Sequence, residues 1–128
     1  MKFIIQKYIE RPLLINERKF DIRIWVLITH NMKVFMFREG YLRTSSHTFD
    51  LENLNDTYVH LTNNAVQKYS KTYGEFEDGN QLSFEQFQQY IDQNQLGFNF
   101  QEKHIPQIKE MIELSAKSVK KKLNPNRR

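Results

Sequence analysis

The chain has 128 residues, enough for one domain with a modest core, and it contains no cysteine. Without cysteine, neither a disulfide framework nor a thiolate metal site is possible. Hydrophobic residues make up 39% of the sequence, with 10 Phe and 6 Tyr, a composition typical of a globular protein rather than a disordered one. No apolar run reaches the roughly 18 residues of a membrane-spanning helix, so we expect no membrane partner.

The net charge of +4 is unevenly distributed. Residues 117–128, KSVKKKLNPNRR, contain six basic residues and no acidic one, so residues 1–116 keep 13 of the 19 basic and all 15 acidic residues, a net charge of −2. Such a segment can bind nucleic acid, membrane surfaces or the acidic tails of other proteins, or it can form a solvated helix end whose cations suit the helix dipole. The body has no recognisable nucleic-acid-binding module, so we expect no nucleic acid as partner.

The first half of the chain alternates apolar and polar residues with the period of a β-strand. The opening stretch FIIQKYI predicts a strand of about six residues, and Pro12 then interrupts regular pairing. Residues 19–29 predict a long strand. A turn around Asn31 leads into a second strand over residues 33–46, with a bend at Gly40, so the two form an antiparallel hairpin.

The second half predicts loops followed by two helices. Residues 45–58 are polar and loop-like, VHLTNNAVQKYS is ambiguous, and KTYGEFEDGNQ is a turn-rich loop. Ser83 and Gln86 have the spacing of a capping box, which predicts a helix near residues 83–94. The second helix is expected to begin near Pro106, because proline is favoured in a first helical turn.

These elements predict an α/β protein, α+β in detail, with a mainly antiparallel sheet covered by two C-terminal helices near residues 83–94 and 104–123. Residues 1–123 are expected to form the domain and residues 124–128 a basic tail. The predicted core consists of eight apolar residues: Ile4, Ile22, Ile24, Val26, Phe35, Phe87, Ile108 and Ile112.

A row of charged side chains backs the apolar face of the first long strand. Lys19, Asp21 and Arg23 alternate with its apolar residues, and such a row is often only a solvent face. The next strand adds further arginines, and HLTN at 60–63 adds polar groups. Guanidinium groups bind phosphate through paired hydrogen bonds, lysine supplies a point charge, and aspartate accepts from ribose hydroxyls. The set would suit a nucleoside triphosphate held against a sheet.

Other kinds of site lack their sequence signals. The glycines occur only at 40, 74, 79 and 97, so neither G-x-G-x-x-G nor a P-loop is present. The histidines at 30, 47, 60 and 104 show no metal-ligand spacing, and we therefore predict no metal ligand in this chain. No nucleophile motif surrounds the serines and threonines.

Four blocks of sequence occur in a specific order: QKYIERPLLI, RKFDIRIWVLI, REGYLRTSS and VHLTNNAVQKYSKTYG. Together they strongly resemble the tubulin–tyrosine ligase family and its ligase-like relatives, from about residue 4 to residue 91 and more loosely through the final helix. The resemblance implies an ATP-grasp-type fold. It also implies an enzyme that uses ATP and magnesium to join a free amino acid to tubulin, or to another acidic-tailed protein, through an amide bond.

The resemblance implies roles for ten residues. The segment expected at the adenine edge is Gln6, Lys7, Tyr8 and Ile9. Further ATP contacts are expected from Lys19, Asp21, Thr62 and Asn63, with Asp21 toward the ribose. Arg23 is expected near the phosphates, and Arg43 at the amino-acid or acyl-phosphate end. The implied mechanism is acyl-phosphate ligation, in which a carboxylate attacks the γ-phosphate and an amine then displaces phosphate.

Two departures from the family pattern shape these expectations. The family's magnesium ligands lie in an acidic segment ending in Glu-x-Asn, downstream of the last helix here, and the family's N-terminal region is also absent, so we expect this chain to be a central fragment of the domain. Several polyglutamylating relatives have Tyr-Ser where this chain has Asn64 and Ala65. This disfavours glutamate elongation and leaves tyrosine, glycine and initiating glutamate open.

The family resemblance places such an enzyme in the cytoplasm, on the cytoskeleton or in the cilium. The alternative is a non-catalytic fragment or pseudoenzyme that binds tubulin through its basic C-terminal segment, with Lys120–Lys122 at its centre.

Overall fold

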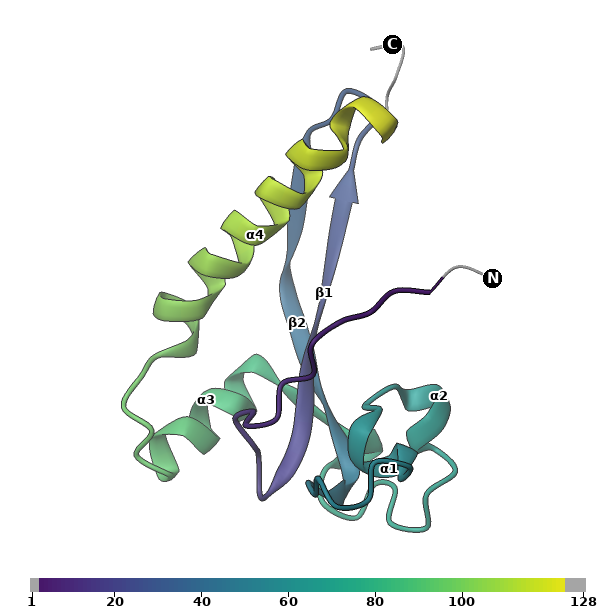
Figure 1. Cartoon of the computed structure of the whole chain (residues 1–128). Helices are drawn as coiled ribbons and strands as arrows, with labels where there is room; N and C mark the ends of the chain where they lie inside the picture. Colours follow the sequence, from purple (N-terminus) through teal and green to yellow (C-terminus); the bar gives the residue numbers. More distant parts are fainter. Residues whose placement is uncertain (1–2, 124–128) are drawn as a thin grey trace. The chain divides into compact units, whose positions relative to one another are not determined.

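The computed structural model describes residues 3–123, so the predicted basic tail at 124–128 lies outside it (Figure 1). Three strands form one sheet in the order β1-β2-β3. Together with the helices of the described chain this is an α/β fold, as predicted. The elements are β1 (Arg18–Ile28), β2 (Val34–Thr48), α1 (Thr57–His60), α2 (Asn64–Gln67), a 3₁₀ turn (Asp78–Asn80), β3 (Gln81–Ser83), α3 (Phe84–Gln93) and α4 (Phe100–Leu123).

The chain divides into two compact units, which are described in turn. The first unit comprises the residues up to Asp21 together with Arg43–Gln81. The second comprises Ile22–Leu42 together with the residues from Leu82 onward.

The interior of the first unit is largely polar. Arg18 is only 1% exposed and forms a two-contact ion pair with Glu77, in which Nη1 donates to Oε2 at 3.0 Å. The same Nη1 donates to the Ser45 carbonyl at 3.1 Å, and the guanidinium carbon lies 4.1 Å from the centre of the Phe76 ring. The hydroxyl of Thr44 donates to Glu77 Oε2 at 2.8 Å. Such hydrogen bonds offset the cost of removing both charges from water.

Two buried amides hold the loops of the first unit against β2. Gln67 accepts from the backbone N–H of Ser46 at 2.7 Å and donates to the Leu61 carbonyl at 2.5 Å. Asn80 donates to the Ser46 hydroxyl at 2.9 Å and accepts from the backbone N–H of Gly74 at 2.7 Å. Because buried backbone groups need hydrogen-bond partners, these amides stabilise the segment that contains HLTN.

The second unit contains the hairpin turn between β1 and β2. The backbone N–H of Thr29 donates to the Lys33 carbonyl at 2.9 Å, which closes a short loop and makes the two strands antiparallel. The predicted turn is confirmed. Met32, with φ of 63°, adopts the left-handed conformation in this turn.

An apolar cluster forms where α3 packs in the second unit. Ser83 and Gln86 make the predicted capping box, with hydrogen bonds of 3.1 and 2.7 Å. Phe87 is 2% exposed, and its ring lies 5.2 Å from the ring of Phe100. β2 runs through Gly40 without interruption, and a Cβ there would lie 2.5 Å from the ring of Phe84. Glycine therefore provides room for an aromatic side chain at this position.

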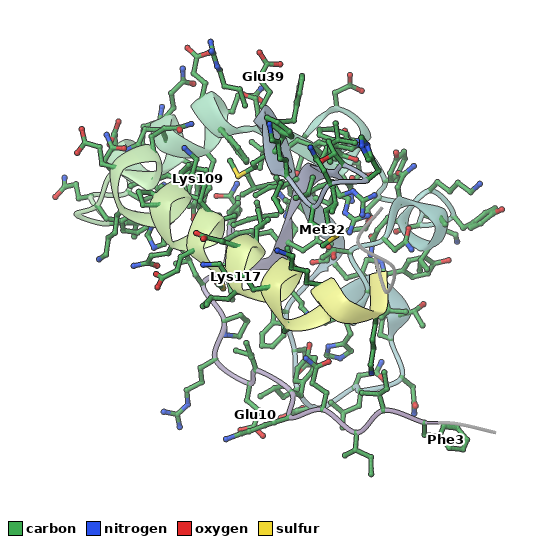
Figure 2. All side chains as sticks on the ribbon, turned by 90° about the horizontal axis from the view of Figure 1, so that it is seen from above. Phe3, Glu10, Met32, Glu39, Lys109 and Lys117 are labelled. Carbon is green, nitrogen blue, oxygen red and sulfur yellow. The ribbon has the colours of Figure 1, made fainter. Side chains whose placement is uncertain are left out.

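Helix α4 begins at Phe100, so the prediction of a start near Pro106 is wrong. Asn99 caps the helix, accepting from the backbone N–H of Lys103 at its carbonyl (3.0 Å) and from that of Glu102 at its side chain (3.1 Å). Six residues of helix thus precede the proline, which the helix accommodates in its interior. The predicted pairing of Glu113 and Lys117 is confirmed at 2.5 Å, and Figure 2 shows Lys117 on α4.

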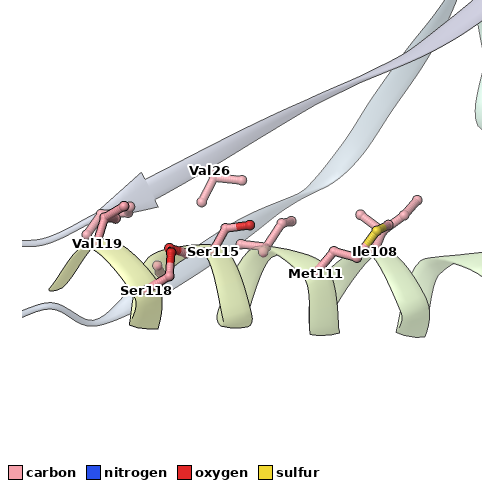
Figure 3. Close-up of a pocket in the computed structure, with 9 residues that line it drawn as sticks. Val26, Ile108, Met111, Ser115, Ser118 and Val119 are labelled. Atoms are coloured by element: carbon pink, nitrogen blue, oxygen red, sulfur yellow. The ribbon is translucent and has the colours of Figure 1, made fainter. Parts of the chain in front are cut away.

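Along the second unit, α4 follows the hairpin and borders an apolar cavity of about 490 Å³ (Figure 3). Its lining includes Val26, Ile108, Met111, Ser115, Ser118 and Val119. Among the described helices none combines the length and apolar character needed to cross a bilayer.

Two predicted boundaries in the first half of the chain are wrong. Residues 3–9 form no strand, because no neighbouring strand pairs with their backbone in the described chain. Strand β2 extends beyond the predicted end at residue 46, so that residues 47 and 48 belong to the strand rather than to the predicted loop.

The predicted core is confirmed in part. Phe87 is buried, and Ile24, Ile108 and Ile112 are half-buried. The other four predictions are wrong, since Ile4 is 93% and Phe35 54% exposed, and Ile22 and Val26 are also exposed. Alternation shows which residues share a face of a strand, but burial requires a second layer over that face.

Candidate functional site

Three predicted site residues meet in the first unit. Arg43, on β2, donates to both carboxylate oxygens of Asp21, on β1, through Nε at 2.8 Å and Nη2 at 2.5 Å. The hydroxyl of Thr62 donates to Asp21 Oδ2 at 2.9 Å. Thr62 is buried, whereas the side chains of Asp21 and Arg43 are 37% and 20% exposed. The carboxylate thus fixes the orientation of a guanidinium group that solvent still reaches.

A second cluster holds two more predicted residues. The ammonium group of Lys19 donates to the Tyr8 hydroxyl at 3.1 Å and to the His60 carbonyl at 3.0 Å. It also lies 4.6 Å from the centre of the Tyr8 ring. The Tyr8 hydroxyl in turn lies 2.9 Å from His60 Nδ1. The sequence interpretation assigned no role to His60 beyond its place in HLTN.

A cavity of about 440 Å³ adjoins this second cluster. Tyr8, Glu10, Leu51, Leu54 and His60 line it. Its volume falls in the range of about 300 to 1,000 Å³ that small-molecule sites occupy, and its wall combines leucine side chains with a few polar groups.

The remaining predicted residues lie outside the two clusters. Asn63 caps α2, accepting from the backbone N–H of Ala65 at 3.0 Å. Gln6, Lys7 and Ile9 are exposed on the extended N-terminal segment, which Figure 2 shows between the labelled Phe3 and Glu10. Arg23 belongs to the second unit, where it is exposed.

The helix that precedes Thr62 is fixed by a carboxylate. Asp56 caps α1, accepting from the backbone N–H of Tyr58 at 2.8 Å, and its other oxygen lies 2.9 Å from His47 Nδ1. The hydrogen bond from His47 is the main cause that lowers the pKa of Asp56, and the Tyr58 N–H adds to it. The ionised carboxylate therefore stabilises the start of α1.

The donor set of the two clusters suits a nucleoside triphosphate. Lys19 and Arg43 carry an ammonium and a guanidinium group of the kind that binds phosphate, and Asp21 carries an acceptor of the kind that binds a ribose hydroxyl. The one hydrogen of the Thr62 hydroxyl is donated to Asp21. Among residues 3–123 there is no group of three or more His, Cys, Asp or Glu that could by itself hold a metal ion.

Comparison with known proteins finds one matching family model and several similar curated proteins. The model of the tubulin-tyrosine ligase family matches residues 1–128. Tubulin glycylase 3B of Tetrahymena thermophila is 41% identical over 119 residues, 91% of this chain and 10% of that protein. Protein monoglycylase TTLL8 of Homo sapiens is 51% identical over 72 residues, 55% of this chain and 8% of that protein.

A third relative is named for a different amino acid. The probable tubulin polyglutamylase TTLL9 of Mus musculus is 40% identical over 91 residues, which are 70% of this chain and 20% of that protein. The chain therefore spans a fifth or less of the length of each of these three curated relatives.

Proposed function

The chain belongs to the tubulin–tyrosine ligase family, and on that premise we propose that it supplies nucleotide-binding residues to an ATP-dependent ligase that joins an amino acid to tubulin. The observation that carries the proposal is the meeting of Asp21, Arg43 and Thr62, three residues from separate family-like blocks, in one hydrogen-bonded cluster. The names of the relatives, which are tubulin glycylases and a polyglutamylase, support tubulin as the acceptor. Because tubulin is the proposed acceptor, we propose that the protein acts on the cytoskeleton or in the cilium.

We propose glycine as the amino acid that is added. Three relatives that align with 90 to 92% of this chain are named tubulin glycylases, and one named a protein monoglycylase is 51% identical over 55% of the chain. The relative named as a probable polyglutamylase is 40% identical over 70% of the chain. The presence of Asn64 and Ala65, where several polyglutamylating relatives carry Tyr-Ser, supports the same choice. In the first unit, Asn64 accepts from the Tyr73 hydroxyl at 2.6 Å.

The proposed reaction has two steps. A carboxylate of the acceptor attacks the γ-phosphorus of ATP, which forms an acyl phosphate and releases ADP. The amine of glycine then attacks the acyl carbon, loses a proton and displaces inorganic phosphate, leaving an amide bond. Both steps develop negative charge on phosphate oxygens, and positioned cations stabilise such charge.

The residues of this chain have distinct roles in the proposal. Lys19 supplies a positive charge for the phosphates, and Asp21 accepts from the ribose while holding Arg43 in place. Arg43 directs its guanidinium group toward the acyl-phosphate end, with Arg23 near the phosphates. Further contacts to ATP are assigned to Gln6, Lys7, Tyr8 and Ile9 at the adenine and to Thr62 and Asn63.

The proposal is tested with Asp21→Asn, which removes the charge that orients Arg43. We expect ATP affinity, measured by calorimetry with and without magnesium, to fall about tenfold or more, since a hydrogen-bonded charge pair is lost. Asp78→Asn is the matched control, because Asp78 is exposed and lies outside both clusters. Equal affinities for the two variants would overturn the assignment of Asp21.

A separate experiment identifies the amino acid that is added. Labelled glycine, glutamate and tyrosine are each tested for transfer to tubulin, and transfer of glutamate or tyrosine alone would exclude glycine.

A further inference from the structure

We propose that His60 is a positioning residue for Lys19, acting through the hydroxyl of Tyr8. The inference rests on the proposed function in one respect, because that function assigns Lys19 to the nucleotide. The contacts that carry it all lie within the first unit and involve residues from four segments: the N-terminal segment, β1, the loop after β2, and α1.

The imidazole of His60 is held on several sides. Nδ1 lies 2.9 Å from the Tyr8 hydroxyl, and Nε2 lies 3.2 Å from the Asn53 carbonyl. The rings of Tyr8 and Phe49 meet it edge-on, at centre-to-centre distances of 5.7 and 6.0 Å. The ring therefore has a fixed orientation with a different partner on each nitrogen.

The partners determine which nitrogen carries the proton. A backbone carbonyl only accepts, so Nε2 of His60 must donate to Asn53. In the neutral imidazole Nδ1 is then the acceptor, and the Tyr8 hydroxyl donates to it. The oxygen of Tyr8 keeps its lone pairs for the ammonium group of Lys19, 3.1 Å away. The hydrogen bonds thus run in one direction, from Lys19 through Tyr8 to His60.

This direction has a consequence for the ammonium group. Lys19 has three N–H donors, of which one is directed to the Tyr8 oxygen and one to the His60 carbonyl. The third has a defined direction as a result, and it is the donor with which Lys19 meets an anionic ligand. If Nδ1 carried the proton, the Tyr8 oxygen would face two donors and would turn its own hydrogen elsewhere.

Two substitutions of His60 test the hydrogen bonds of its two nitrogens separately. In His60→Asn the side-chain amide occupies the position of Nδ1 and restores an acceptor for Tyr8. In His60→Gln the amide occupies the position of Nε2, keeps a donor for Asn53 and leaves the Tyr8 hydroxyl without an acceptor. The contact from Lys19 to the backbone carbonyl of residue 60 is available in both variants. A difference between His60→Asn and His60→Gln therefore reports on the hydrogen bond from the Tyr8 hydroxyl to residue 60.

The first measurement does not require ATP. Nitrogen-15 spectra of the imidazole in the full chain are expected to show His60 as the Nε2–H tautomer, with an Nδ1 resonance that moves in Tyr8→Phe. A predominant Nδ1–H tautomer, or an Nδ1 resonance unchanged in Tyr8→Phe, would overturn the inference. This result holds whether or not the chain binds ATP, so it is separate from the failure of the proposed function.

The second measurement is the dissociation constant of ATP by calorimetry. We expect His60→Gln to weaken binding about tenfold and His60→Asn less than about threefold, since one directed hydrogen bond is lost in the former and kept in the latter. Equal weakening in the two variants would show a merely structural role. If the wild-type chain does not bind ATP, the proposed function fails for this chain, and the tautomer measurement alone decides the inference about His60.

Discussion

At the scale of single residues, the buried charge of Arg18 requires Glu77. The two side chains are 1% and 9% exposed, so removing one charge leaves the other in a medium that solvates it poorly. We expect Glu77→Gln to lower the free energy of unfolding by about 3 kcal/mol. Urea denaturation measures this value.

The matched control for Glu77→Gln is Glu75→Gln, because Glu75 is exposed and belongs to the same loop. Its effect should stay within about 0.5 kcal/mol. A Glu77→Gln variant as stable as this control would mean that the ion pair contributes nothing to the first unit.

Asp56 gives the molecule a pH dependence whose sign is determined by its pKa. Since the hydrogen bond from His47 lowers that pKa from 3.8, the unfolded state binds the proton more readily than the folded state. The stabilisation is fully present above pH 3.8 and is lost as the pH falls below it and through the folded-state pKa. Asp56→Asn keeps a good N-cap but removes the charge.

We therefore expect the stability difference between wild type and Asp56→Asn to shrink as the pH falls below about 4. Urea denaturation at a series of pH values measures it. A difference that grows in acid would contradict the assigned sign.

At the scale of elements, Gly40 determines how closely α3 approaches β2. A Cβ at this position would lie 2.5 Å from the Phe84 ring and 2.6 Å from the backbone oxygen of Arg23. We expect Gly40→Ala to destabilise the chain by about 1 to 3 kcal/mol, because the interior is already well packed. The unfolding midpoint in urea measures the effect.

The same substitution in a Phe84→Leu chain tests why Gly40→Ala is destabilising. In a Phe84→Leu chain, part of the clash is removed, so Gly40→Ala should cost less there than in wild type. Equal costs in both backgrounds would show that the backbone contact with Arg23, rather than the aromatic ring, determines the requirement for glycine.

At the scale of the whole molecule, positive charge is concentrated in the C-terminal segment. Lys120 and Lys122 are exposed, whereas residues 1–116 carry a net charge of −2. If the chain binds acidic tails through this segment, Lys120→Ala with Lys122→Ala should weaken binding to a polyglutamate peptide about fivefold to tenfold. The loss should be smaller at high salt, because salt screens exposed charges.

The control for this experiment is Lys68→Ala with Lys71→Ala, which removes the same charge from exposed positions of the first unit. Fluorescence anisotropy of a labelled peptide measures both variants. Equal losses would indicate a nonspecific effect of net charge, and no loss in either would exclude the basic segment as a binding site.

Local signals in the sequence determined the hairpin, the capping box at Ser83 and the family membership. The hairpin and the cap each depend on a few neighbouring residues, such as the alternation in residues 19–29 or the spacing from Ser83 to Gln86, so the pattern contains the physical cause. The family membership depends on four ordered blocks of sequence and on a family model that matches residues 1–128. Asn99 caps the start of α4, and the prediction of a start near Pro106 did not take this local signal into account.

The tertiary structure decided which polar residues meet and which apolar residues are covered. Arg18 and Glu77 are 59 positions apart, and Tyr8 and His60 are 52 apart, so their hydrogen bonds depend on how distant segments pack. Ile4 and Phe35 are apolar but exposed, because burial depends on a second layer that no strand specifies for itself. The sequence by itself thus determined the hairpin, the start of α3 and the family, whereas the pairing around Asp21 and Lys19 was decided by long-range packing, in which free energy depends on contacts between residues far apart in the chain.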